Sequence, residues 1–213
     1  MAETEQTQAL KIDPVSASAV AALQDDPFYR SICGVYALDP SRRRAILSPY
    51  FDFSIQEGRE LGRCVHLPNP ALGVAVWLLP QSREVQSRAA HKKHSFLQAT
   101  LDTQGWANYY RIVDFMHAQS ATLVDSGAWY LSIVAVAPSS QGQGLGRKLL
   151  EPTLSEADSV SATCYLETFG PRNLAFYQRL GFAAKARFAE PTTGAEYALM
   201  VRPPLAPAQN LAF

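Results

Sequence analysis

The sequence predicts an α+β protein, because three stretches carry strand and helix patterns in succession. An apolar, β-branched run over 130–137 leads into a glycine-rich loop over 139–148 and then into a helical pattern. A second strand pattern over 162–168 precedes a short helix over 171–180, with Gly181 placed to end it. Two more strand patterns, over 182–186 and 196–201, predict a closing hairpin.

In the first quarter of the chain, the patterns predict two helices separated by a loop. Asp13 and Pro14 are placed as the N-cap and first residue of a helix that ends near Asp25, Asp26 and Pro27. Phe28 and Tyr29 open a predicted aromatic-rich loop. A second helix is expected from Pro40, because apolar residues follow at helical spacing as far as residue 55.

Two strands and two helices are predicted next. A weak strand pattern covers 63–68, and an unbroken apolar run over 72–80 indicates a strand that is covered on both faces. Residues 81–120 are mostly polar, with apolar residues spaced for helix faces. Gly105 is expected to divide this region into two helices.

The glycine-rich loop has the composition of a phosphate site. Its glycines let backbone N–H groups approach an anion, and the helix that follows adds a partial positive charge. Arg147 and Lys148 stand in the first helical turn, where the helix dipole disfavours cations, so a bound polyphosphate would account for them. The spacing of Gly142, Gly144 and Gly146 fits neither a P-loop nor a dinucleotide fingerprint.

The composition indicates an ordinary globular protein with one well-buried domain. The 213 residues are 47% hydrophobic, and 19 basic residues balance 19 acidic ones, which argues against a general nucleic-acid or membrane surface. Three distant cysteines without a C-x-x-C pair argue against a disulfide framework and a zinc site, so we expect no metal. The polar, acidic N-terminus and strand-length apolar runs predict no signal peptide or membrane span, hence a cytoplasmic protein.

The second strand–helix unit carries a family resemblance. Residues 166–182, with the sequence LETFGPRNLAFYQRLGF, resemble the end of a GNAT superfamily N-acetyltransferase, most closely puromycin N-acetyltransferase and its relatives. The run QGQGLG over 141–146 fits the Q/R-x-x-G-x-G/A loop of that superfamily, and VAVW over 74–77 also recurs there. The similarity covers about residues 12–202, which we interpret as a single domain between flexible termini, 1–11 and 203–213.

The resemblance implies a GNAT fold, in which a splayed, mixed and mostly antiparallel sheet is flanked by helices. It implies that acetyl-CoA, the co-substrate, enters a gap between the strand ending at Val136 and the strand ending at Thr168. There the pantetheine amides pair with backbone groups that the neighbouring strand leaves open. The residues that it assigns to acetyl-CoA are Val134, Ala135, Val136, Gln141, Gly142, Gln143, Gly144, Leu145, Gly146, Arg147, Asn173 and Tyr177.

The resemblance also implies two catalytic roles. Tyr177 matches the general acid that protonates the leaving CoA thiolate. Glu167 matches a position that some GNAT enzymes use as a general base, although a structural, salt-bridged Glu is an equal alternative. Many members carry a CoA-binding Asn where this chain has Gly170, and Asn173, one helical turn before Tyr177, is the nearest Asn.

The leading functional hypothesis is transfer of an acetyl group from acetyl-CoA to a primary amine of a small molecule, by direct attack. Two alternatives stay open: acetylation of a protein N-terminus or lysine, and a non-catalytic acyl-CoA-binding sensor. His94 and His117 are other candidates for the base, and a monomer or homodimer is expected. Aromatic residues predict a cavity for an amphipathic acceptor, namely Phe28, Tyr29, Trp77, Trp129 and Tyr130.

Overall fold

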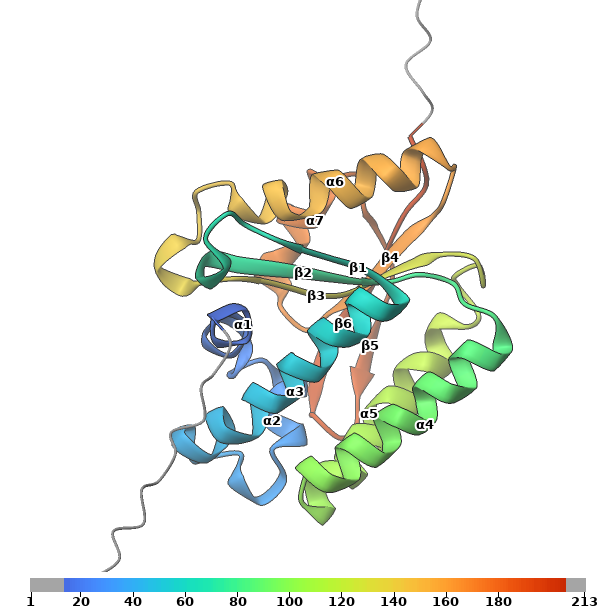
Figure 1. The fold of residues 1–213 in the computed structure, drawn as a ribbon. Helices are drawn as coiled ribbons and strands as arrows, with labels where there is room; N and C mark the ends of the chain where they lie inside the picture. Colours follow the sequence, from blue (N-terminus) through green and yellow to red (C-terminus); the bar gives the residue numbers. More distant parts are fainter. Residues whose placement is uncertain (1–13, 206–213) are drawn as a thin grey trace, which may run out of the picture.

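The computed structural model describes residues 14–205, and its centre is one sheet of six strands. The strands are β1 (Gly62–His66), β2 (Gly73–Leu78), β3 (Trp129–Val136), β4 (Cys164–Thr168), β5 (Ala183–Glu190) and β6 (Ala195–Arg202). They follow the order β1-β2-β3-β4-β6-β5 across the sheet (Figure 1). β3 and β4 run parallel, and the other neighbours run antiparallel. The predicted α+β class with a mixed, mostly antiparallel sheet is confirmed.

Helices cover both faces of this sheet (Figure 1). The helices are α1 (Pro14–Leu23), α2 (Pro27–Ile32), α3 (Pro40–Leu61), α4 (Arg83–Thr100), α5 (Thr103–Ser120), α6 (Leu145–Ser159) and α7 (Leu174–Gln178). Single 3₁₀ turns are η1 (Gly34–Tyr36), η2 (Pro70–Leu72), η3 (Pro138–Ser140) and η4 (Pro171–Asn173). The helices α1 to α5 lie on one side of the sheet, and α6 and α7 lie on the other.

The two faces of the sheet bury separate apolar cores, and a third, smaller cluster is formed by Ile112, Phe169 and Tyr197. Val74 and Val76 of β2 pack with the helices α1 to α5, whereas Ala75 and Trp77 pack with α6 and α7. β2 is therefore buried on both faces, as its unbroken apolar run predicts. Each core removes large side chains from water entirely, and burying one such side chain contributes about 1.5–3 kcal/mol.

Two predicted details of the helical region are wrong. Phe28 and Tyr29 lie in α2 rather than in a loop, because Asp26 caps that helix by accepting a hydrogen bond from the Phe28 N–H at 2.9 Å. The break in 81–120 falls at Asp102, which caps α5, and Gly105 lies inside α5. A Cβ on Gly105 would stand 2.2 Å from the Ile32 carbonyl oxygen, so this glycine permits close helix contact.

Some expectations fall outside the described residues. Asp13 as an N-cap, the flexible terminus 1–11 and most of the flexible terminus 203–213 belong to this group. Residues 203–205 are described and have no regular structure. Within residues 14–205, no helix is long and apolar enough to cross a membrane.

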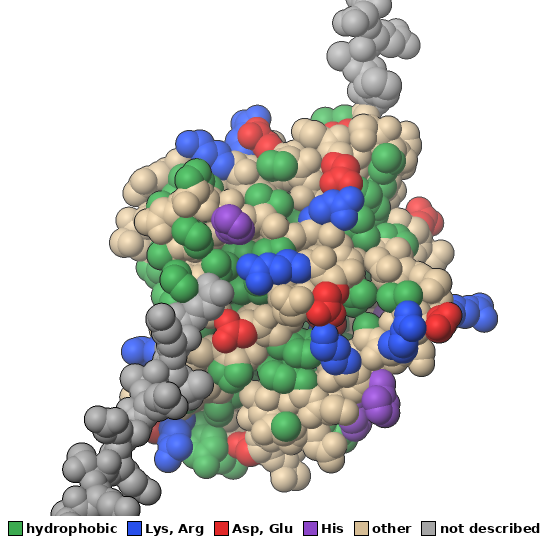
Figure 2. All heavy atoms as spheres, viewed as in Figure 1, with side chains coloured by type: hydrophobic (Ala, Val, Ile, Leu, Met, Phe, Trp, Pro, Cys, Tyr) green, Lys and Arg blue, Asp and Glu red, His purple; other side chains and the backbone are tan. Residues whose placement is uncertain are grey.

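Charged side chains are dispersed over the surface. On the face drawn in Figure 2, basic and acidic side chains lie interspersed rather than in a large patch of one sign. Several of them form surface ion pairs, such as Arg63 with Glu156 and Lys92 with Glu60. Such exposed pairs contribute little to stability, about 0–1 kcal/mol each.

Candidate active site

The sheet opens between β3 and β4. These strands pair only from Trp129 to Leu131 on β3 and from Cys164 to Leu166 on β4, although both continue further. Just beyond the last pair, Ser132 is an extra residue in β3, because Leu131 lies opposite Trp77 and Ile133 opposite Val76. A bulge of this kind bends a strand and disrupts its ladder. The divergence creates a gap where backbone groups of β3 have no partner on β4.

A cavity of about 490 Å³ lies over the glycine loop at this gap. It is lined by residues of β3, the loop, the start of α6, and the η4–α7 segment. Nine of the predicted acetyl-CoA residues line it: Val134, Val136, Gln141, Gly142, Gly144, Leu145, Gly146, Asn173 and Tyr177. The loop and the second strand–helix unit, far apart in sequence, therefore meet in one cleft.

The glycine loop presents its backbone to this cleft. Gly142 and Gly144 have left-handed φ angles of 78° and 74°, and a Cβ on either would meet nothing within 4 Å. Gly144 is the N-cap of α6 and supplies no side-chain hydrogen bond, so the first N–H groups of this helix stay open to an anion. Gln141 ties the loop to β3 by donating from Nε2 to the Val136 carbonyl oxygen at 3.1 Å.

Three predicted cofactor residues do not line the cleft. Ala135 is 2% exposed and packs in the core, and Gln143 is not among the lining residues. Arg147 is also absent from the lining, and its side chain pairs with Glu151 at 2.5 Å, one helical turn along α6. Arg179, just after α7, supplies a cation to the cleft instead. No sequence motif singled it out, since its approach to the loop depends on how α7 packs.

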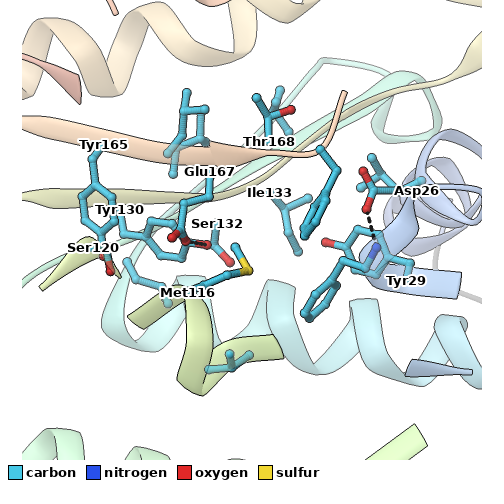
Figure 3. A pocket seen from close by; sticks show the side chains of 18 of the residues that line it. Asp26, Tyr29, Met116, Ser120, Tyr130, Ser132, Ile133, Tyr165, Glu167 and Thr168 are labelled. Carbon is cyan, nitrogen blue, oxygen red and sulfur yellow. Dashed lines mark hydrogen bonds between the residues drawn. The ribbon is translucent and has the colours of Figure 1, made fainter. Parts of the chain in front are cut away.

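A second cavity of about 270 Å³ lies beside the first (Figure 3). Val134, Asn173 and Tyr177 line both cavities and so mark the junction between them. Three of the predicted acceptor residues line the second cavity, namely Phe28, Tyr29 and Tyr130.

Trp77 and Trp129 lie elsewhere. Trp77 is fully buried and Trp129 is 8% exposed, and both pack in the core beneath α6. They point to the opposite face of the sheet from Tyr130, because successive side chains of a strand alternate between faces. Neither residue lines either of these two cavities, so the structure does not bring them together with the other predicted acceptor residues.

Tyr177 is held rigidly at the junction. Its ring lies between Phe176 and Phe182, with ring centroids 5.0 and 5.9 Å away. Burial raises the pKa of Tyr177 well above its usual value, and the charge of Asp26 adds to the effect. The phenol therefore stays protonated at neutral pH and can act as a proton donor. Asn173 beside it donates from Nδ2 to the Thr168 hydroxyl at 3.4 Å, linking η4 to the end of β4.

Glu167 lies in the second cavity next to a pair of stacked tyrosine rings, Tyr130 and Tyr165. The Tyr130 hydroxyl donates a hydrogen bond to Oε2 of Glu167 at 3.3 Å, and Oε1 is buried without a hydrogen-bond partner within residues 14–205. Burial raises the pKa of Glu167 to about 7. No ion pair among the described residues includes Glu167, so the salt-bridged alternative has no partner.

Other ionisable side chains of the second cavity were not anticipated from the sequence. Asp26 lines it, and burial raises its pKa to about 6. Lys93 also lines it and pairs with Glu57 at 2.7 Å. Asp26 was read only as the end of a helix, and Lys93 belongs to a polar helix with many exposed cations, so nothing local distinguished either residue.

The two histidines that were candidates for the general base lie in different parts of the structure. His117 lines the second cavity with an exposed side chain. His94 forms a contact of 3.0 Å with the Tyr110 hydroxyl between α4 and α5 and lines neither cavity. Within residues 14–205, no group of His, Cys, Asp and Glu side chains is arranged to hold a metal ion.

Comparisons with known proteins identify a family. The model of the acetyltransferase (GNAT) family matches residues 61–182, which contain the glycine loop, Glu167 and Tyr177. An uncharacterized N-acetyltransferase of Schizosaccharomyces pombe is 24% identical over 172 residues, which cover 78% of this chain and 68% of the relative.

Solved structures share the fold. A crystal structure described as histone acetyltransferase HPA2 and related acetyltransferase, from Corynebacterium glutamicum, superimposes with a TM-score of 0.60 at 25% identity, over 91% of each chain. A mosquito arylalkylamine N-acetyltransferase like 5b gives a TM-score of 0.51 at 14% identity, over 82% of this chain and 86% of that chain. The second likeness concerns the fold alone.

Proposed function

The chain belongs to the acetyltransferase (GNAT) family and is an acyl-CoA N-acyltransferase, and from this premise we propose that it acetylates a primary amine of a small molecule. The observation that carries the proposal is the junction of the two cavities. Val134, Asn173 and Tyr177 line both, so a thioester reaching this point from the cleft would face an amine in the second cavity. Each reactant then has its own site, and positioning alone supplies a large part of the rate.

We propose that the cleft holds acetyl-CoA with its pyrophosphate on the glycine loop. The open N–H groups at the start of α6 and the left-handed glycines support this assignment. Arg179 adds a full positive charge to the cleft. The backbone N–H and C=O groups of β3 around Val134 have no partner on β4. The pantetheine amides would form hydrogen bonds with these groups.

The proposed reaction is direct acyl transfer. The amine nitrogen attacks the thioester carbonyl carbon, a C–N bond forms, and the C–S bond breaks as CoA leaves as a thiolate. The amine loses one proton, which Glu167 accepts on its unpaired Oε1, and Tyr177 donates one proton to the sulfur. With a pKa of about 7, Glu167 is partly ionised at neutral pH and is suited to this exchange.

The size of the second cavity favours a compact acceptor. Its volume of about 270 Å³ lies below the usual range for drug-sized ligands, which is roughly 300–1,000 Å³. Relatives and neighbours carry names that point in different directions, one to histones and one to arylalkylamines. The cavity volume, together with its aromatic lining, supports a small amine over a folded protein surface.

The test is a panel of acceptors with purified protein and acetyl-CoA, followed by release of the CoA thiol. The panel contains alkylamines, arylalkylamines, puromycin, and peptides offering an N-terminal amine or a lysine. We expect turnover with compact amines, above the rate of hydrolysis measured without any acceptor. Turnover with the peptides alone would replace the proposal with protein acetylation, and turnover with none would refute it.

A further inference from the structure

The second cavity, which we call the acceptor cavity because the proposed amine would bind there, contains a carboxylate at each end. Figure 3 shows Glu167 at one end, beside Tyr130 and Ser132, and Asp26 at the other end, beside Tyr29. Neither takes part in an ion pair within the described part of the chain. Burial raises the pKa of both carboxyl groups, because the ionised form loses favourable contact with water.

The other ionisable groups of the cavity do not neutralise these two carboxylates. Lys93 is paired with Glu57 at 2.7 Å, so its charge is already balanced. His117 is exposed to solvent and forms no ion pair among the described residues. Between pH 7 and 8, the cavity therefore carries an excess of negative charge that a cationic ligand would balance.

The fold does not need the charge of Asp26. Its structural role is to cap α2 through the hydrogen bond from the Phe28 N–H to Oδ1, and Asn or Ser would serve equally well as a cap. Asp26 is half-buried, and a partly buried carboxylate without a cation is disfavoured compared with a neutral cap. A cationic ligand would balance this charge, which the cap itself does not require.

We propose that the acceptor is a diamine that binds as a dication, with its reacting ammonium group at Glu167 and its second ammonium group at Asp26. The reacting group first releases one proton to solvent and becomes a neutral amine, which then attacks the thioester and gives its second proton to Glu167. This inference rests on the proposed function and names the substrate class of that site. The lining of the cavity includes aromatic rings, among them Phe28, Tyr29 and Tyr109. Ring faces attract cations and pack against alkyl chains, so this lining suits a linear diamine.

The experiment compares amines that differ only in a terminal ammonium group: putrescine with butylamine, and cadaverine with pentylamine. We expect wild-type kcat/KM to be about tenfold or more higher for a diamine than for its monoamine, since a partly buried charge pair is gained. In Asp26→Asn this preference should disappear, because KM rises for the diamine and not for the monoamine.

A matched control is Asp39→Asn. Asp39 also precedes a proline and caps a helix, accepting hydrogen bonds from the Ser41 and Arg42 N–H groups, but it is exposed and lines neither cavity. This variant should keep the wild-type preference. If Asp26→Asn is unstable, Asp26→Ser retains the cap, and thermal stabilisation by putrescine relative to butylamine gives a readout without turnover.

The outcomes distinguish failure of the dication proposal from failure of the proposed function. Turnover of monoamines without any preference for diamines would overturn the dication and leave the proposed function standing. Equal loss of turnover for both amines in Asp26→Asn would mean that Asp26 serves monoamines and diamines alike, and this result would also overturn the dication proposal. If no small amine is acetylated, the proposed function fails, and the dication falls with it.

Discussion

Replacing Tyr177 with Phe tests the proposed chemistry most directly. The substitution removes one hydroxyl at the junction of the two cavities and retains the ring, which packs between Phe176 and Phe182. Because the glycine loop is untouched, the affinity for CoA should change little.

The expected magnitudes differ between stability and turnover. The ring contacts survive, so the free energy of unfolding should change by no more than about 1 kcal/mol, the usual contribution of one hydrogen bond. Loss of a general acid lowers turnover by about 10²-fold or more, equivalent to about 2.7 kcal/mol of activation free energy. Burial raises the pKa of the Tyr177 phenol, so the hydroxyl keeps its proton over the pH range of the assay.

The assay pairs two measurements on one sample. Thermal unfolding reports whether Tyr177→Phe is folded, and single-turnover kinetics report acetyl transfer without a contribution from product release. A matched control is Tyr197→Phe, which removes a buried hydroxyl from a tyrosine that lines neither cavity. The control should keep wild-type turnover.

One result would refute the reasoning. If Tyr177→Phe is folded and transfers acetyl groups at the wild-type single-turnover rate, its hydroxyl does not protonate the thiolate. The proton would then come from solvent, and Tyr177 would serve only to pack the junction.

Three further predictions concern the loop and the base. Gly144→Val should weaken CoA binding measured by calorimetry, and unchanged affinity would remove the loop from the site. The matched control is Gly194→Val in the β5–β6 turn, where the glycine has a similar φ and equally open space around it. Both variants should lose comparable stability, about 1–3 kcal/mol, but Gly194→Val should not change the affinity for CoA. Wild-type turnover should rise with pH through about 7 as Glu167 loses its proton, and Glu167→Gln should abolish this inflection. Because folding raises the pKa of Glu167 from 4.5 to about 7, the free energy of unfolding falls as pH rises across that interval and changes no further above it. Glu167→Gln should therefore unfold at a higher temperature than wild type at pH 8 but not at pH 4, and a lower temperature at pH 8 would contradict this.

The sequence predicted the elements that local patterns determine. Gly181 ends the segment after β4 with a φ of 89°, and the Phe182 N–H donates to the Tyr177 carbonyl oxygen, as expected of a glycine after a helix. The glycine loop is equally local, because Gly142 and Gly144 adopt a backbone conformation that other residues rarely adopt. These features depend on residues that are neighbours in the sequence, and so they can be predicted from the sequence alone.

The contents of the acceptor cavity were decided only by the tertiary structure. Trp77 was expected there and packs on the other face, because an unbroken apolar strand has no alternation to indicate which face a side chain takes. Asp26 was read as a helix end and lies in the cavity, because α2 begins there and packs against the sheet side that holds Tyr130. The sequence determined the glycine loop and the position of Tyr177 after it. Long-range packing brought Asp26 and Glu167 into one cavity, since burial and proximity between distant segments have no signature in local spacing.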